Sequence, residues 1–332
     1  MKLYKVIKDV RQFYVYNNLA TIVYMDRVAV GNVHLEATED DDYFVRNGVL
    51  IKSVPSAPMS YKQYRFNEDK FEKEECQYAN NFYFNKNSWL SKGYSDGIIR
   101  VALTVNREKY LFNIVAKKHP NIPHYSFRYG ILMLTSSNSI IFCTKLGERL
   151  WEYIEDNDSL KINSGCMPIV DNVVVLISED CGVAEKIQGF NIRTGEKLWE
   201  ILNAEEIVCP NTFFVSEDQH LYGCCTECAY YDEESKLIMT KLNPKNGDTE
   251  SVEVGMGYSV MPYDVTMHGR QLYYTDNRRG NEIGVIDVDK RELIERVPLN
   301  IKKKVTIGAP VVTDDKVYVF IRDLKELRVY EK

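Results

Sequence analysis

The 332-residue sequence predicts an all-β fold, a single β-propeller domain built from four-stranded antiparallel blades. Two repeated patterns support this prediction. The first is a strand–turn–strand unit whose copies start roughly 40 to 50 residues apart. The second is a hairpin that precedes the unit. Together they supply four strands per repeat, and four-stranded sheets repeated around an axis form a β-propeller.

The clearest strand–turn–strand unit is residues 190–199. Phe190 and Ile192 alternate with polar residues, which is the period of a half-buried strand. Gly195 can adopt a positive φ at no steric cost, as a tight hairpin requires. Trp199 then offers a large apolar surface to a neighbouring sheet. Further copies lie at residues 64–70, 103–112, 142–151, 242–248 and 286–294.

The preceding hairpin is clearest at residues 167–177. An apolar strand, the polar turn Asp171-Asn172 and a second apolar strand follow one another there. The same pattern recurs around the turn Asp314-Asp315. We expect similar turns near residues 17–18, 47–48, 85–87, 129–130, 217–218 and 268–269.

These repeats predict eight blades. The last repeat has three strands of its own, so Met1–Ile7 can pair there as the fourth strand and close the ring by covering an exposed edge. The alternative is seven blades with an N-terminal insertion. The predicted blades lie at about residues 11–42, 43–77, 80–116, 122–155, 166–202, 209–254, 260–299 and 307–332, the last completed by residues 1–7.

Composition excludes several classes of protein. A net charge of −6 and a pI near 5.6 disfavour nucleic acid as a partner. No apolar run approaches the roughly 20 residues that a membrane helix needs. The N-terminal residues lack the apolar region of a secretion signal. We therefore expect a cytoplasmic protein, monomeric and without a membrane partner.

Residues 189–199 resemble the repeat of the pyrroloquinoline-quinone-like (PQQ-like) propellers, whose signature is an Asp or Asn, then Thr-Gly, then a Trp. Residues 147–151, Gly-Glu-Arg-Leu-Trp, are a second match. The resemblance implies the propeller fold. It implies structural roles for four residues: Gly147, Trp151, Gly195 and Trp199.

The same family contains quinoprotein dehydrogenases as well as non-catalytic scaffolds. The vicinal pair Cys224-Cys225 is similar to the disulfide that lies over the quinone in the alcohol dehydrogenases. Those enzymes are exported, much longer and bind calcium, and no motif marks calcium ligands in this sequence. The resemblance is therefore assigned to the non-catalytic branch, without a cofactor.

A cysteine cluster is the other candidate for chemistry. Cys225 and Cys228 have the two-residue gap that lets both thiolates reach one zinc ion. Two more ligands would be needed, from Cys209, His220 or Cys224. The alternative is that Cys224 and Cys225 lie in or beside a strand, where one of them faces the core as a small apolar residue. The absence of a second Cys-x-x-Cys favours this alternative, and we predict no metal.

No catalytic motif is present. The sequence lacks a Gly-x-Ser-x-Gly elbow, a phosphate-binding glycine-rich loop and a His-Glu-x-x-His array. We therefore predict a non-catalytic scaffold that binds a protein partner with a basic face, by charge complementarity. A toxin-neutralising, immunity-type protein would fit. The alternative is a ligand-binding or enzymatic propeller with a site in its central channel. The predicted contact residues are acidic or aromatic: Glu39, Asp40, Asp41, Asp42, Tyr230, Tyr231, Asp232, Glu233 and Glu234.

Overall fold

A computed structural model shows the protein to be almost entirely β-structure. Its described residues form 33 strands in eight antiparallel sheets, and the short helices η2 (Pro262–Asp264) and η3 (Arg322–Leu324). The predicted all-β fold of four-stranded antiparallel sheets is confirmed, with a fifth strand in one described sheet, whereas the number of blades and their limits stay predictions. The described residues are 1–16, 18–38, 41, 43–46, 49–53, 61–67, 70–75, 81–85, 88–95, 98–105, 108–115, 124–127, 130–144, 146, 148–163, 165–181, 183–204, 207, 212–227, 235–257, 260–276, 281–301 and 305–332.

The chain folds as two compact units. We call residues 9–136 and 140–151 the first unit, and residues 1–8, 137–139 and 152–332 the second unit. In the part of the chain that the structure describes, no helix is long and apolar enough to cross a membrane.

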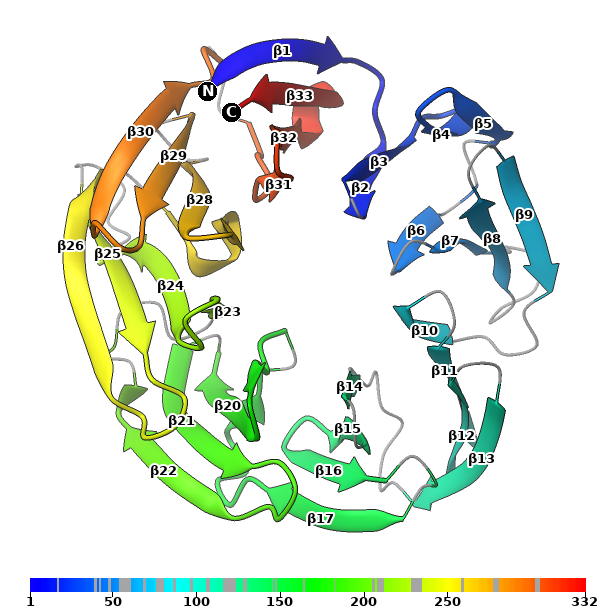
Figure 1. Cartoon of the computed structure of the whole chain (residues 1–332), viewed down its shortest axis with the longest axis vertical. Helices are drawn as coiled ribbons and strands as arrows, with labels where there is room; N and C mark the ends of the chain where they lie inside the picture. The colour runs from blue at the N-terminus through cyan, green and yellow to red at the C-terminus, as the bar shows by residue number, and fades with distance from the viewer. Residues whose placement is uncertain are drawn as a thin grey trace. The chain divides into compact units, whose positions relative to one another are not determined.

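Each sheet of the first unit connects strands in sequence order, so each is a meander (Figure 1). A fourth sheet contains residues of both units. The three sheets of the first unit are β2 (Gln12–Tyr16), β3 (Leu19–Val23), β4 (Arg27–Val30) and β5 (Val33–Glu36); β6 (Tyr43–Arg46), β7 (Val49–Ser53), β8 (Tyr61–Asn67) and β9 (Lys70–Glu75); and β10 (Asn81–Asn85), β11 (Ser88–Ser95), β12 (Ile98–Val105) and β13 (Glu108–Val115). The shared sheet is β14 (His124–Phe127), β15 (Gly130–Ser136), β16 (Ser139–Cys143) and β17 (Arg149–Ile154).

The second unit holds four further sheets, and the site described below lies there. They are β18 (Lys161–Ile162), β19 (Ile169–Val170), β20 (Val173–Asp180), β21 (Val183–Asn191) and β22 (Lys197–Leu202); β23 (Phe214–Val215), β24 (Leu221–Thr226), β25 (Ser235–Leu242) and β26 (Thr249–Gly257); β27 (Val265–His268), β28 (Gln271–Asp276), β29 (Glu282–Asp287) and β30 (Glu292–Pro298); and β31 (Val311–Val312), β32 (Lys316–Ile321) and β33 (Glu326–Glu331) with β1 (Lys2–Ile7).

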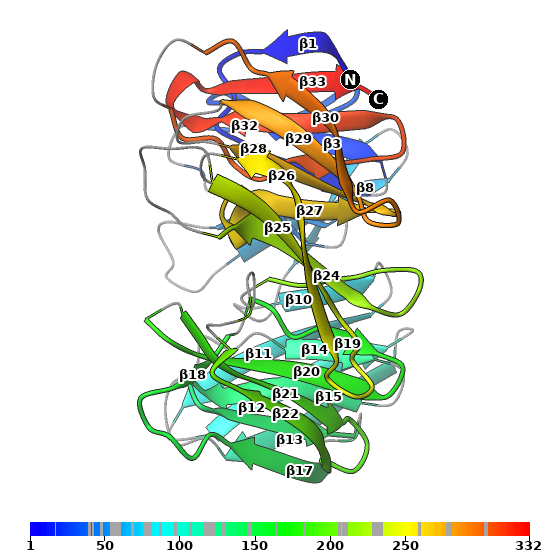
Figure 2. The same ribbon diagram turned by 90° about the vertical axis from the view of Figure 1, so that its left-hand side faces the viewer.

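The predicted pairing of the N-terminal strand is confirmed. Strand β1 lies antiparallel to β33, with Lys2 opposite Glu331 and Ile7 opposite Leu327. Both views show β1 alongside β33 (Figure 1, Figure 2). The fourth strand of this sheet therefore comes from the other end of the sequence.

Apolar side chains from successive sheets of the second unit pack against one another. One buried cluster joins Val175 and Ile177 of β20 to Leu221 of β24 and Leu242 of β25. A second cluster packs β24 and β25 against β28 and β29, and a third packs β28 and β29 against β32 and β33. The sheet β23–β26 contributes to the first two clusters and the sheet β27–β30 to the last two, so the inner strands of these two sheets are buried on both faces.

The strand–turn–strand unit has the same turn in three sheets. The carbonyl oxygen of Asn191 accepts the N–H of Gly195 at 2.8 Å, and that of Asn243 accepts the N–H of Gly247 at 2.9 Å. In the third copy the acceptor is Asp287, and the donor four residues later is an arginine rather than a glycine, at 2.9 Å. All three donors have a positive φ, between 59° and 80°.

Trp199 closes the gap between the sheets β18–β22 and β23–β26. A Cβ atom built on Gly189 would lie 2.2 Å from the Trp199 ring, and one built on Gly247 would lie 2.7 Å from it. Its indole Nε1 donates to the carbonyl oxygen of Pro244 at 2.7 Å. Glycine at both positions gives the ring its space, and the indole fastens one sheet to the turn of the next.

Candidate functional site

A charged pocket opens between the sheets β23–β26 and β27–β30. It has a volume of about 160 Å³. Both sheets belong to the second unit, and the pocket lies beside turns of both. Three acidic and three basic side chains line it, so their formal charges cancel. The lining residues are Asp218, Tyr222, Met239, Lys241, Glu250, Val252, Arg270, Val288, Asp289 and Arg291.

Arg270 links the two sheets. Its Nε donates to Asp289 Oδ2 at 3.1 Å, and its Nη2 donates to the other oxygen of the same carboxylate. Its Nη1 lies 3.0 Å from Asp218 Oδ1 and also donates to Ser216 Oγ. The guanidinium carbon is 5.4 Å from the centre of the Tyr222 ring, within cation–π range. Arg270 is therefore held in place from several directions.

These contacts keep the groups around Arg270 ionised. The hydrogen bond to Asp289 is the largest effect raising the pKa of Arg270, and the same contact lowers the pKa of Asp289. Burial alone would raise the pKa of Asp218, but hydrogen bonds from Tyr222 and Arg270 outweigh it and lower that pKa to about 2. A general acid or base needs a pKa near the working pH. The pKa values of Asp218 and Asp289 are lowered, so neither carboxyl is tuned for proton transfer at neutral pH.

A second ion pair spans the same two sheets. Arg291, in the turn between β29 and β30, donates through Nη1 and Nη2 to the two carboxylate oxygens of Glu250, at 2.5 and 2.9 Å. Both side chains are about half exposed. Arg291 has a φ of 59°, a left-handed conformation that non-glycine residues adopt infrequently. The pair thus borders the pocket on its solvent side.

Lys241, on β25, is the third cation of the pocket. Its ammonium lies 5.9 Å from the centre of the Tyr222 ring. Among the described residues no carboxylate forms an ion pair with it, although its charge, after that of Arg270, also lowers the pKa of Asp289. Lys241 is therefore the cation of this pocket that can take an anion without first giving up a carboxylate of the protein.

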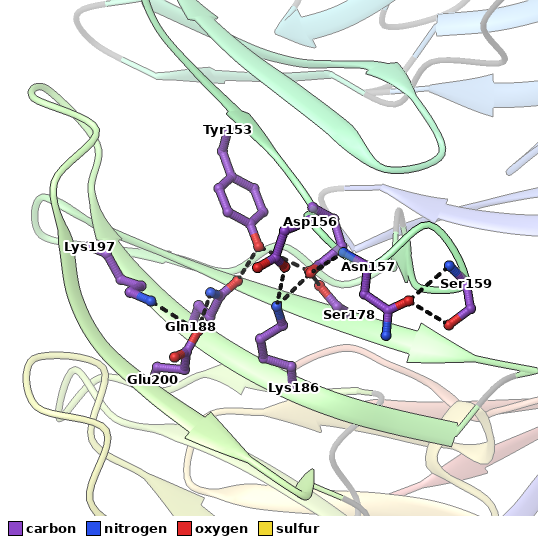
Figure 3. Close-up of polar contacts among 10 residues, drawn as sticks. Tyr153, Asp156, Asn157, Ser159, Ser178, Lys186, Gln188, Lys197 and Glu200 are labelled. Atoms are coloured by element: carbon purple, nitrogen blue, oxygen red, sulfur yellow. Dashed lines mark hydrogen bonds and ion pairs between the residues drawn. The ribbon is translucent and has the colours of Figure 1, made fainter.

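A separate buried cluster joins the shared sheet to the sheet β18–β22 (Figure 3). Glu155, just after β17, has a fully buried side chain. Its carboxylate accepts hydrogen bonds from Ser178 Oγ at 2.6 Å, from Lys186 Nζ at 2.5 Å and from Tyr153 at 2.9 Å. The Tyr153 hydroxyl also contacts Gln188 at 2.7 Å, on the same strand as Lys186.

Lys186 is protonated in this cluster. Burial alone would lower its pKa, but the hydrogen bond and the charge of Glu155, with those of Asp156, outweigh burial and raise the pKa. The Asp156 carboxylate, which is largely exposed, lies 3.2 Å from the same ammonium. Because each buried polar group has a partner, we assign this cluster to holding two sheets together rather than to a reaction.

The acidic and tyrosine-containing contact loops fall mostly outside the described residues. This applies to Glu39, Asp40, Asp42, Tyr230, Tyr231, Asp232, Glu233 and Glu234. Asp41 is described and is 6% exposed. Its carboxylate lies 2.6 Å from Lys52 Nζ and accepts the N–H of Thr38 at 2.8 Å. We therefore leave Asp41 out of the contact surface proposed below.

The described part of the cysteine cluster is buried in a strand. Cys224 and Cys225 lie on β24, and burial raises the pKa of the Cys224 thiol well above its ordinary value. His220 lies in the turn before β24, with its ring Nδ1 3.0 Å from the carbonyl oxygen of Asp218. Cys209 and Cys228 lie outside the described residues. Within those residues, no three potential metal ligands gather.

The four predicted structural residues lie in or beside the repeats. Gly195 has a φ of 74°, and Trp199 bridges two sheets as described above. Trp151 is buried, with its ring 5.9 Å from that of Phe142. Gly147 lies outside the described residues.

Sequence reasoning missed the pocket. Arg270, Asp218 and Asp289 are far apart in the sequence, and no local motif joins them. The sequence held one signal: Arg291 stands where three other copies of the strand–turn–strand unit have glycine, at 147, 195 and 247.

Fold and site together define a β-propeller with a charged pocket between two of its sheets. No protein-family model and no curated protein sequence matches the chain. Among solved structures, BamB from Moraxella catarrhalis is similar. The structural alignment covers 99% of this chain and 99% of BamB, with 11% sequence identity and a TM-score of 0.61. This similarity shows the β-propeller fold.

Two enzymes are more distant in structure. The alignment with a europium-containing methanol dehydrogenase covers 64% of this chain and 49% of the dehydrogenase, with 12% sequence identity and a TM-score of 0.42. The second enzyme is a catalytically inactive virginiamycin B lyase from Staphylococcus aureus, crystallised with quinupristin. The alignment covers 92% of this chain and 99% of the lyase, with 13% sequence identity and a TM-score of 0.49. We draw no functional conclusion from either.

Proposed function

We propose that the protein is a non-catalytic β-propeller that binds a protein partner through the turns around the charged pocket. The paired charges of the pocket carry this proposal. The guanidinium of Arg270 is held by the carboxylates of Asp289 and Asp218, so the site presents a fixed pattern of charge. Rigid, complementary charge gives a partner orientation and specificity.

The overall charge favours one kind of partner. The net charge of −6 and the acidic residues Glu39, Asp40, Asp42, Asp232, Glu233 and Glu234 would attract a protein with a basic face. A cytoplasmic, monomeric chain of this kind could neutralise a toxic enzyme, as immunity proteins do. That specific role is tested by expressing the product of the neighbouring gene alone. If that product is not toxic, or if this protein does not relieve its toxicity, the immunity-type role is excluded.

Arg291→Gly is the variant that separates binding from folding. It removes a guanidinium from the pocket, and glycine is the residue that two other repeats use in the same left-handed turn. Glu250 then loses its partner, but it is half exposed and stays solvated. We therefore expect the variant to fold with unchanged or slightly higher stability.

The experiment is affinity purification of the tagged protein from its native cells, with mass spectrometry of the bound material. The matched control is Lys245→Gln, since Lys245 is an exposed lysine of a neighbouring turn whose ion pair with Asp171 lies outside the pocket. We expect a stoichiometric protein partner with the wild type and the control, and its loss with Arg291→Gly. Equal recovery of the partner by all three proteins would remove the pocket from the binding surface.

A further inference from the structure

The pocket occupies the position that a tryptophan fills between the preceding pair of sheets. Gly189 on β21 lies opposite Trp199 on β22. At the same place in the next sheet, Lys241 on β25 lies opposite Glu250 on β26. The register thus matches Gly189 with Lys241 and Trp199 with Glu250.

The facing turns correspond in the same way. Gly247 contacts Trp199 from the next sheet, and Arg291 contacts Glu250 from the next sheet. Each is the fourth residue after an Asn or Asp, donates its N–H to the carbonyl oxygen of that residue and has a positive φ. A glycine, a tryptophan and a glycine at one interface are therefore replaced by a lysine, a glutamate and an arginine at the next.

This replacement works against stability. The tryptophan buries apolar surface between two sheets, whereas the charged residues leave a cavity of about 160 Å³. Arg291 also adopts a left-handed φ that glycine adopts without strain. Because folding alone favours the tryptophan arrangement, the charged one points to a ligand.

We propose that the pocket binds a carboxylate group, with Lys241 as its direct ligand. Arg270 and Arg291 are already bound to carboxylates of the protein, whereas Lys241 contacts the face of Tyr222 and lines the cavity. A lysine ammonium has three N–H donors for an incoming anion. With Lys241 included, the formal charges of the pocket cancel, because two acid–base pairs and one further acid accompany it.

The acidic lining selects among anions. Asp218, Glu250 and Asp289 face the same cavity and repel a second negative charge on the ligand. A singly charged carboxylate is therefore favoured over a phosphate dianion. The carboxylate can belong to an acidic side chain of the protein partner or to a free small molecule, and in the first case the inference rests on the proposed function.

The test uses Lys241→Gln, Lys241→Arg and the control Lys245→Gln in two arms. In the first arm, N-acetylglycine and propionate are titrated into the full-length protein by NMR, with phosphate as the comparison anion. We expect the wild type, Lys241→Arg and Lys245→Gln to bind the carboxylates, and phosphate to bind less. Loss of the charge-assisted contact in Lys241→Gln lowers the affinity roughly 10- to 100-fold.

In the second arm, the same four proteins capture the partner from native cells, with and without excess N-acetylglycine. A partner lost with Lys241→Gln, kept with Lys241→Arg and displaced by the free carboxylate identifies a carboxylate of the partner. Carboxylate binding that needs Lys241, with partner capture unaffected or with no partner at all, identifies a free small molecule. The second result leaves the inference standing even if the proposed function fails. If Lys241→Gln behaves as the wild type in both arms, the inference is wrong.

Discussion

Removing either member of the buried Glu155–Lys186 pair should destabilise the protein by about 3–5 kcal/mol, because it leaves the other charge buried without its partner. The Glu155 side chain is fully buried and that of Lys186 is 11% exposed. Glu155→Gln keeps the shape and one acceptor oxygen, and Lys186→Met keeps the aliphatic stem. Asp156 stays beside Lys186 in the first variant, so its cost lies at the lower end of this range.

The double variant distinguishes a coupled pair from two independent residues. With both charges gone, no uncompensated ion remains. The double variant should therefore lose less unfolding free energy than the two single variants lose in total. We expect a coupling free energy of about 2–3 kcal/mol. The assay is urea unfolding followed by tryptophan fluorescence, with unchanged m values as the check that the unfolding transition is comparable.

Lys197→Met is the matched control. Lys197 pairs with Glu200 at 3.1 Å on the same strand, but its side chain is 47% exposed. An exposed pair of this kind contributes about 0–1 kcal/mol. Strictly additive effects of Glu155→Gln and Lys186→Met, or single effects no larger than that of the control, would refute the assignment of this cluster to holding the two sheets together.

Three further outcomes are expected. Trp199→Phe should lose about 1 kcal/mol in urea unfolding, because the hydrogen bond to the Pro244 carbonyl disappears; no change would show that this bond contributes nothing net. Gly247→Ala should cost more than Gly269→Ala, since both have a positive φ but a Cβ at 247 would lie 2.7 Å from the Trp199 ring, whereas one at 269 meets no atom within 4 Å; equal costs would contradict the packing described. Asp218→Asn should flatten the pH dependence of stability, measured by thermal unfolding between pH 5 and 2. The pKa of Asp218 is lowered from 3.8 to about 2, so it contributes stability above pH 3.8 that is lost as the pH falls through 2, and an unchanged acid profile would contradict this.

Local patterns in the sequence predicted the local parts of the fold. The alternation around Phe190 and the glycine at 195 predicted a strand and a tight turn, because both depend on neighbouring residues alone. The pairing of Met1–Ile7 with the last repeat was also predictable, because that repeat has too few strands of its own. Repeats make such counting possible even for contacts between the two ends of the sequence.

The charged pocket was not predictable in the same way. Asp218, Arg270 and Asp289 meet because turns of two sheets come together, and nothing in the neighbourhood of each residue records that meeting. Asp41 is the converse case. Its place in a run of acids led to its prediction as a partner-contact residue, but its side chain is buried and paired with Lys52 of β7. The ion-pair partners of a charged residue can be identified only when the sheets that bring them together are known.

The mass of the native complex, measured by size-exclusion chromatography with light scattering, tests the central claim most directly. The account predicts a complex of one chain with one protein partner for the wild type and for Lys245→Gln, and a free chain for Arg291→Gly with unchanged thermal stability. A wild-type protein that is purified alone from its native cells and converts a small molecule would contradict the account.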